Sequence, residues 1–226
     1  MSMKTALLTG LVAATALTAC GPKYEDSGEV FSALSASLLD RGGEEASAEE
    51  AAVAQQAQVN AAAQAIASGE TLLYASIPSR EANAYVQEVG RNGSEVTWLS
   101  PDGITVTYEN GLLVATRGLG PDLMAANVSG TVAAIRQGGG SVTRSHEYLD
   151  GLDHLVRQDY SCTVTRVGNE PIEIFEVAHA TVKYEESCQS AGATFTNTYW
   201  VDNSGVVWKS RQLISPPVGY LDTYRL

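Results

Sequence analysis

The sequence is poor in basic side chains. Its 226 residues hold 14 Lys and Arg against 26 Asp and Glu, and the formal net charge at pH 7 is −12. A surface of this sign repels nucleic acids and anionic lipid headgroups, so neither is expected as the main partner. A chain of this length can form one domain with a proper hydrophobic core.

Long apolar runs are also missing, whereas a membrane-spanning helix takes about 20 apolar residues. The clearest apolar stretch follows Lys4 in "MSMKTALLTGLVAATALTA" and runs from about Ala6 to Leu17. This layout is typical of a bacterial secretory signal peptide. We therefore predict a signal peptide over residues 1–19, with a transmembrane helix as the weaker alternative.

The tetrapeptide "LTAC", Leu17 to Cys20, closes that stretch. It resembles the lipobox of bacterial lipoproteins, which implies that the Cys20 thiol takes a diacylglycerol and becomes the new N-terminus, anchored in a lipid bilayer. Gly21 stands where an Asp signals inner-membrane retention in enteric bacteria, and this favours the outer membrane. An ordinary cleaved signal that ends near a cysteine is the alternative.

Cysteine is scarce, with three in the chain. If Cys20 is acylated, Cys162 and Cys188 remain as an even pair in an oxidising compartment. Both lie in strand-like segments, so we predict a disulfide between them, worth about 3.5 kcal/mol in the chain-entropy model. A metal site is the weaker alternative because the two lack the close spacing that zinc ligation prefers.

Catalytic motifs are absent from the sequence. It contains no G-x-S-x-G, and "GLGPDL" lacks the Lys and the following hydroxyl residue of a phosphate-binding loop. His146, His154 and His179 lie in separate segments. We predict no catalytic residue, no metal ligand and no cofactor, and hence no enzyme.

Two acidic pairs are the alternative to that prediction, because a glycosidase needs two carboxylates that flank the bond. They are Asp150 with Asp153 and Glu185 with Glu186. Both pairs fall at predicted turns or strand ends, where solvated carboxylates are the ordinary finding.

Residues 20–70 form a tether with few large apolar side chains. Its Ala- and Glu-rich part favours helix, and "SAEE" places Ser47 as N-cap with Glu50 three residues on. We predict a helix over residues 47–67, and the sequence leaves open whether it is docked on the domain or stands off from it.

Residues 71–226 change to strand-like alternation broken by turn dipeptides. Asn92-Gly93, Asp102-Gly103 and Asn110-Gly111 are strong hairpin signals and predict a four-stranded antiparallel meander. Further turns are predicted near 150–151, 168–169 and 203–204. We expect an all-β antiparallel domain, closed as a barrel-like sheet or a sandwich, preceded by the Ala-rich helix.

Two-residue loops in the meander would set its register. They would place Leu99, Val106 and Ala115 side by side in the core and would turn Trp98 to the other face.

The last hairpin carries a candidate binding surface. Its expected register puts Thr198 and Trp200 on one face with Lys209 and Arg211. Indole rings stack on sugar CH groups and cations pair with acidic substituents, so this face suits an acidic polysaccharide. The alternative is a Trp200 packed under a neighbouring segment, with solvated cations around it.

The stretch "TWLSPDGITVTYENGLLVATRGLGPDL", residues 97–123, resembles the signature of the YjbF/GfcB family, the group 4 capsule polysaccharide lipoproteins. The resemblance implies a lipoprotein of the outer membrane that faces the periplasm and serves as a non-catalytic accessory or scaffold in exopolysaccharide and capsule export. It also implies an outer-membrane β-barrel export protein as partner. A stand-alone carbohydrate-binding lipoprotein is the second hypothesis, and a polysaccharide hydrolase is the third.

Overall fold

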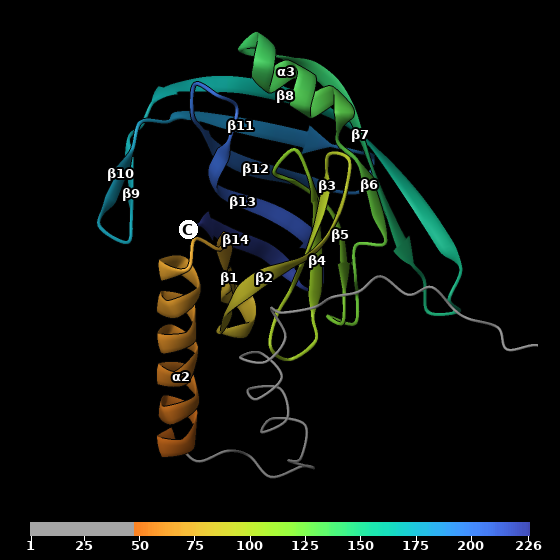
Figure 1. The fold of residues 1–226 in the computed structure, drawn as a ribbon. Coiled ribbons are helices and arrows are strands. Elements are labelled where there is room, and N and C mark those ends of the chain that lie inside the picture. The colour runs from red at the N-terminus through yellow and green to blue at the C-terminus, as the bar shows by residue number, and fades with distance from the viewer. Residues whose placement is uncertain (1–47) are drawn as a thin grey trace, which may run out of the picture.

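Strands dominate residues 48–226, the part of the chain that the computed structural model describes (Figure 1). The predicted signal peptide, Cys20 and the tether as far as Ser47 lie outside these described residues. The elements are α2 (Ala48–Ala67), β1 (Leu72–Ile77), η1 (Pro78–Arg80), β2 (Ala82–Asn92), β3 (Glu95–Leu99), β4 (Thr105–Glu109), β5 (Leu112–Arg117), β6 (Ala125–Asn127), α3 (Ser129–Gln137), β7 (Gly139–Leu149), β8 (Leu155–Asn169), β9 (Ile172–Ile174), β10 (Val177–His179), β11 (Val182–Gln189), β12 (Thr194–Val201), β13 (Val207–Ser215) and β14 (Gly219–Arg225).

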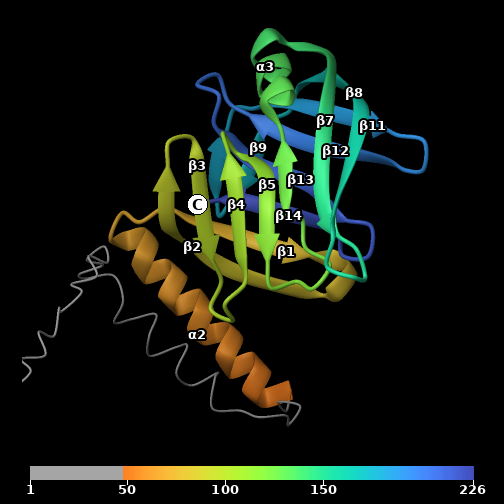
Figure 2. The same ribbon diagram turned by 90° about the vertical axis from the view of Figure 1, so that its right-hand side faces the viewer.

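Twelve strands form one antiparallel sheet in the order β5-β4-β3-β2-β1-β14-β13-β12-β11-β8-β7-β6. The sheet curls until its two edge strands, β5 and β6, lie beside each other (Figure 2). The Thr116 amide donates to the Leu123 carbonyl, 2.9 Å away, at this seam. The domain is therefore mostly β, as predicted, and of the two predicted closures it adopts the barrel-like one.

The meander β2–β5 is present, and one of its turns matches the expected geometry. Glu109 pairs with Leu112, which leaves Asn110 and Gly111 as a two-residue turn with φ of 50° and 81°. A Cβ on Gly111 would lie 2.7 Å from a Val207 methyl group. Glycine is required here both by its φ and by this close approach.

The predicted register of β3 and β4 is wrong by one residue. Ser100 donates to Ile104, and Gly103 has a φ of 87°, so the loop holds three residues instead of two. Trp98 consequently pairs with Val106 and is buried, at 3 % exposure. A one-residue slip moves every side chain to the other face, so Trp98 takes the core position expected for Leu99.

The neighbouring turns deviate in similar ways. A bulge between Thr107 and Tyr108 pairs Val106 with Thr116, so Ala115 is not in the core row with Val106 as predicted. Asn92 pairs with Glu95, so the first turn lies one residue later than expected.

The predicted turns near 150–151 and 203–204 connect β7 to β8 and β12 to β13. Near 168–169 the chain does not turn straight back, because β8 runs to Asn169 and the small hairpin β9–β10 follows before β11 begins. In Figure 1 this hairpin descends past the ends of β11 to β14 towards α2.

Helix α2 covers the segment expected to be helical and lies against β1 and β2 (Figures 1 and 2). Ala62 is buried beside Leu72 and Tyr85, whereas Val53 and Ile66 are exposed. The helix is thus docked through small side chains over a limited area. Among the described residues, neither α-helix has the length and apolar character needed to span a membrane.

Helix α3 was not expected from the sequence. The Asn127 side chain accepts the Ser129 amide at its start, and Gly138, with φ of 87°, ends it. Val132 and Ile135 pack into the core between α3, β5, β8 and β12. The helix therefore covers one end of the barrel, where it also reaches the polar interior.

Candidate functional site

The barrel interior holds a fully buried ion pair. Arg144 of β7 and Glu186 of β11 have no exposed side-chain surface, and Arg144 Nη1 lies 3.0 Å from Glu186 Oε2. Taking both charges out of water is unfavourable, so such a pair needs further hydrogen bonds to persist.

Glu186 receives those hydrogen bonds from side chains of two elements, α3 and β12. Thr131 of α3 donates over 2.5 Å, Tyr199 over 2.7 Å and Asn197 over 2.9 Å. Burial alone would raise the pKa of the Glu186 carboxyl, but Arg144 and these donors outweigh it and lower the pKa. Glu186 is thus held ionised and is not available as a general acid.

His146 completes the pair on its other side. Arg144 Nε donates to His146 Nε2 over 2.8 Å, so that nitrogen carries no proton and Nδ1 donates to Tyr148. Burial, followed by the charge of Arg144, lowers the pKa of His146 to about 2. This imidazole is neutral at any physiological pH.

The interior network also closes the barrel seam. Arg144 Nη2 donates to the Leu113 carbonyl of β5 over 3.2 Å, and Gln212 accepts the Leu113 amide over 2.8 Å. Among the described residues, every buried side-chain nitrogen or oxygen has a hydrogen-bond partner. The network therefore satisfies backbone groups of the edge strand β5.

The two acidic pairs named from the sequence do not converge on a bond. Glu186 points into the barrel and Glu185 outward, because successive strand residues face opposite ways. Asp150 lies in the β7–β8 turn and accepts the amides of Leu152 and His154. Its carboxylate therefore stabilises the turn.

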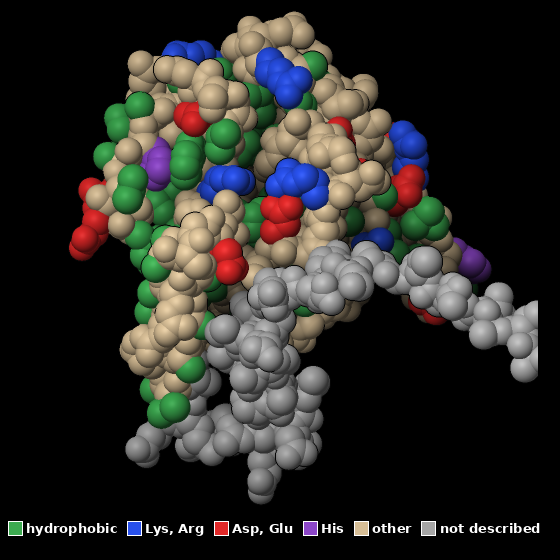
Figure 3. All heavy atoms as spheres, viewed as in Figure 1, with side chains coloured by type: hydrophobic (Ala, Val, Ile, Leu, Met, Phe, Trp, Pro, Cys, Tyr) green, Lys and Arg blue, Asp and Glu red, His purple; other side chains and the backbone are tan. Residues whose placement is uncertain are grey.

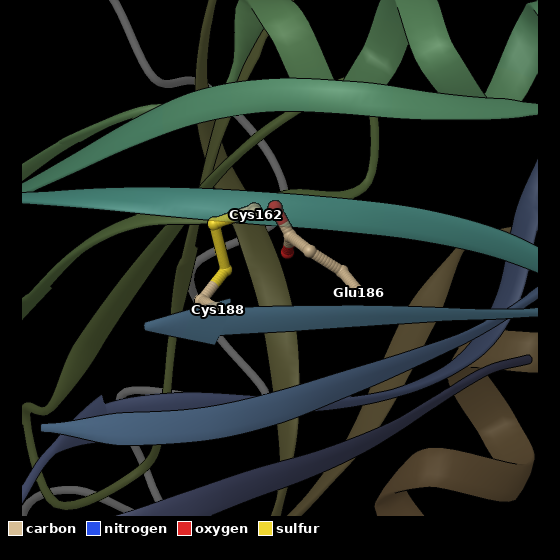
Figure 4. A group of neighbouring side chains, drawn as sticks. All are labelled: Cys162, Glu186 and Cys188. Carbon is tan, nitrogen blue, oxygen red and sulfur yellow. A yellow bond between two sulfur atoms is a disulfide. The ribbon is translucent and has the colours of Figure 1, made fainter. Parts of the chain in front are cut away.

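Cys162 of β8 and Cys188 of β11 form a disulfide with an S–S distance of 2.04 Å. They are direct cross-strand partners, and Glu186 lies beside them (Figure 4). The three side chains are close enough for metal ligation. In the disulfide neither sulfur is a thiolate, and Glu186 is already bound to Arg144, so the group offers no free ligand.

The structure places all four predicted polysaccharide-binding residues on one outer face. Trp200 pairs with Lys209 and Thr198 pairs with Arg211 across β12 and β13. The four residues share the predicted face, although their pairing does not follow the expected short loop. The loop holds three residues, Asn203 to Gly205, and a bulge lies between Trp200 and Val201. What these residues bind stays a prediction.

Trp200 is buried under neighbouring side chains. It is 7 % exposed, and its Nε1 donates to Glu170 over 2.8 Å. The ammonium groups of Lys209 and Lys183 lie 4.3 and 5.5 Å from its ring centroid. The indole therefore serves as a platform under two lysines, and a sugar on this face would meet the cations first.

Arg211 is held by its neighbours on β14. Its Nη1 lies 2.9 and 2.8 Å from the two carboxylate oxygens of Asp222, and its guanidinium lies 4.6 Å from the Tyr220 ring centroid. Lys209, in contrast, has no carboxylate of the described residues within ion-pair distance.

Sequence reasoning missed most of a continuous row of side chains, which we call the outer row. Its members are cross-strand partners on six neighbouring strands, namely Tyr85, Tyr74, Tyr224, Lys209, Trp200 and Lys183. Five strand spacings of about 4.8 Å give the row a length of roughly 24 Å. Its members come from both ends of the domain, so hairpin patterns could not reveal it.

The outer row is packed along its length. Ring centroids lie 5.3 Å apart for Tyr74 and Tyr85 and 6.1 Å apart for Tyr74 and Tyr224, and Lys209 Nζ lies 5.2 Å from the Tyr224 centroid. The β9–β10 hairpin flanks the row, with Phe175 6.2 Å from Tyr85. The result is a surface of aromatic rings and cations beside a projecting hairpin.

Comparison with known proteins gives a family match and a structural likeness. The family described as "Group 4 capsule polysaccharide lipoprotein gfcB, YjbF" matches residues 44–226. The crystal structure of the hypothetical lipoprotein YmcC from Escherichia coli (K12) superposes with a TM-score of 0.62 at 22 % identity, covering 70 % of this chain and 86 % of that one. At that identity the likeness shows a shared fold. No curated protein matches the sequence.

Proposed function

The chain belongs to the group 4 capsule polysaccharide lipoprotein family, and from that premise we propose that it is a non-catalytic accessory of exopolysaccharide and capsule export. The family match over residues 44–226 carries the proposal, because it spans the whole sheet and agrees with the resemblance of residues 97–123. The coarse role, a lipoprotein connected with capsule polysaccharide, follows from the family itself.

The proposed location is the periplasmic side of the outer membrane, with acylated Cys20 in the bilayer. The lipobox-like "LTAC", the Gly21 that follows it and the family's description as lipoproteins support this. The Cys162–Cys188 disulfide suits an oxidising compartment. Several acyl chains would give stable anchoring, whereas one binds only marginally.

The proposed role is that of a scaffold for polysaccharide export, without catalysis or a cofactor. Support comes from the interior, where Arg144 bonds to both His146 and Glu186 and also to the seam strand β5. The proposed partner is the outer-membrane β-barrel export protein that the family resemblance implies.

The outer row, with Thr198 and Arg211 beside it, is the proposed contact for an acidic polysaccharide. Lys209 supplies a cation without a carboxylate partner among the described residues, and Tyr74 and Tyr224 supply rings for sugar CH groups. The row is long enough for several sugar units in succession. A stand-alone carbohydrate-binding lipoprotein is the second candidate function and uses the same surface.

Substitution of the anchor tests the proposal in the native host. In a Cys20→Ala variant we expect the protein to leave the membrane fraction and surface polysaccharide to fall, because the scaffold is no longer held at the export site. Mass spectrometry of the wild-type N-terminus should show an acylated cysteine. An unmodified N-terminus other than Cys20, or normal surface polysaccharide with the soluble variant, would overturn the proposal.

A pull-down from native envelope separates the two candidate functions. Recovery of an outer-membrane β-barrel protein supports the export accessory. Recovery of polysaccharide without that protein supports the stand-alone binding lipoprotein. Shortening of the host polysaccharide by the purified protein would contradict both.

A further inference from the structure

A pocket of about 270 Å³ opens at the mouth of the barrel. It lies on the inner face of the sheet, whereas the outer row lies on the outer face. It lies where the β2–β3, β4–β5 and β12–β13 turns meet the end of β14. We call it the mouth pocket and define it by Arg91, Trp98, Tyr108, Trp208, Thr223 and Arg225. Figure 3 shows Lys and Arg side chains gathered near the centre of this view, with carboxylates beside them.

Two arginines line this pocket, and Glu88 pairs with one of them. Arg91 binds Glu88 through Nε over 2.9 Å and Nη2 over 2.7 Å. Arg225 is partly buried, and within the described residues it forms no ion pair. Burial and then the charge of Arg91 lower the pKa of Arg225, while Glu88 opposes them. Arg225 is therefore an unpaired cation, within the described residues, in a protein whose total charge is −12.

The walls of the pocket are aromatic and fixed in place. Trp98 and Tyr108 are buried, at 3 % and 5 % exposure. Trp208 donates its Nε1 hydrogen to Asp202 over 2.8 Å, and its ring centroid lies 3.8 Å from that of His179 on the β9–β10 hairpin. A ring held from two sides loses little freedom when a ligand settles against it.

Polar groups also line the cavity, beside apolar side chains such as Leu73 and Val96. Thr223 and Ser210 share a hydrogen bond of 2.9 Å, and Ser94 and Asn110 lie at the exposed rim. Hydroxyl and amide groups of this kind hydrogen-bond sugar hydroxyls. Carboxylates pair with guanidinium groups in planar, bidentate fashion.

We propose that the mouth pocket binds one carboxylate-bearing saccharide unit, with its carboxylate at Arg225 and Arg91 and its ring against Trp208. The volume lies near the lower end of small-molecule pockets, roughly 300 Å³, and accommodates a single unit. Lys209 and Tyr224 of the outer row each adjoin a pocket residue in sequence, Trp208 and Arg225, and lie on the other face of the sheet. The choice of an acidic saccharide as the ligand rests on the proposed function. Binding in the pocket does not require the lipid anchor at Cys20.

Titration of the mature protein, purified in detergent, tests this site. The probes are an oligosaccharide of glucuronate, a neutral glucose oligosaccharide of equal length and inorganic phosphate. We expect binding of the glucuronate oligosaccharide in calorimetry, with a change in tryptophan fluorescence that disappears in Trp208→Phe. Arg225→Gln should weaken this binding at least about tenfold, as expected for loss of a charge-assisted contact.

One matched variant removes a positive charge elsewhere. Arg157→Gln alters an exposed arginine of β8. It should retain the affinity of the pocket, and thermal unfolding should show that Arg225→Gln is folded. Equal weakening by Arg157→Gln, equal binding of the neutral oligosaccharide, phosphate as the only ligand, or no binding at all would overturn the inference. The Cys20→Ala experiment in cells is unaffected by any of these results.

Discussion

The barrel interior and its mouth differ in whether their charged side chains are paired. Inside, Arg144 and Glu186 are fully buried and every hydrogen-bonding group has a partner. At the mouth and along the outer row, Arg225 and Lys209 have no ion-pair partner among the described residues. The difference indicates that the interior charges hold the barrel together, whereas the outer cations are those that we propose a ligand contacts.

The sharpest test of the interior is to remove one charge of its pair. Arg144→Met should lower the free energy of unfolding by about 3–5 kcal/mol, because Glu186 is left buried without a counter-charge. Urea denaturation measures the loss. Arg157→Met, which breaks an exposed pair with Asp159, should cost at most about 1 kcal/mol. Equal losses in the two variants would remove the distinction between inside and outside.

The disulfide beside the ion pair is the next largest contribution. Cys162→Ala combined with Cys188→Ala should lower the free energy of unfolding by about 3.5 kcal/mol, for a bridge over 26 residues. Thiol titration of the unfolded, unreduced protein should find neither cysteine free. Two reactive thiols per chain would show that the bridge does not form in the cell.

The pH dependence of stability tests whether His146 is neutral in the folded protein. Its pKa lies near 2 when folded and near 6.5 when unfolded, so the unfolded chain binds an extra proton between these values. The free energy of unfolding should therefore fall as pH falls below about 6.5, by up to about 1.4 kcal/mol per pH unit.

His146→Gln should flatten that slope between about pH 6.5 and 5, above the range where the Glu186 carboxylate begins to lose its own contribution. His154→Gln, which removes an exposed imidazole, is the control. Denaturation curves at each pH measure the slope. An unchanged slope in His146→Gln would mean that this imidazole is not held neutral.

The smallest effect on stability is expected in the outer row. Lys209→Met should change the free energy of unfolding by less than about 1 kcal/mol, since the residue contributes two cation–π contacts at a partly exposed site. Its co-sedimentation with the host polysaccharide should nevertheless decrease. Strong destabilisation with unchanged binding would place Lys209 with the structural charges instead.

Local patterns predicted much of the fold. Asn110-Gly111 gave its turn correctly because a two-residue loop with two positive φ angles demands such residues. Pro101-Asp102-Gly103 misled because Asp-Gly also ends three-residue loops, and the extra residue exchanged the faces of Trp98 and Leu99. Helix α3 was missed because its nine residues carry few signals besides Gly138.

The candidate site was predictable only within one hairpin. The face shared by Thr198, Trp200, Lys209 and Arg211 was predicted from a short loop. Their pairing was not, because it also depends on a bulge between Trp200 and Val201. The covering of Trp200 by Glu170 and Lys183 was not predicted either, because both belong to segments outside that hairpin.

The sequence by itself determined the strand-rich domain, the cysteine pair, the face shared by four residues of the last hairpin and the family, since each depends on local spacing or a contiguous motif. Tertiary structure decided which charges are paired and which are open. Arg144 meets Glu186 once β8 has paired with both β7 and β11, and Arg225 approaches Arg91 once β1 has paired with both β2 and β14. A charge acquires its role from burial and from its neighbours, and long-range strand pairing sets both.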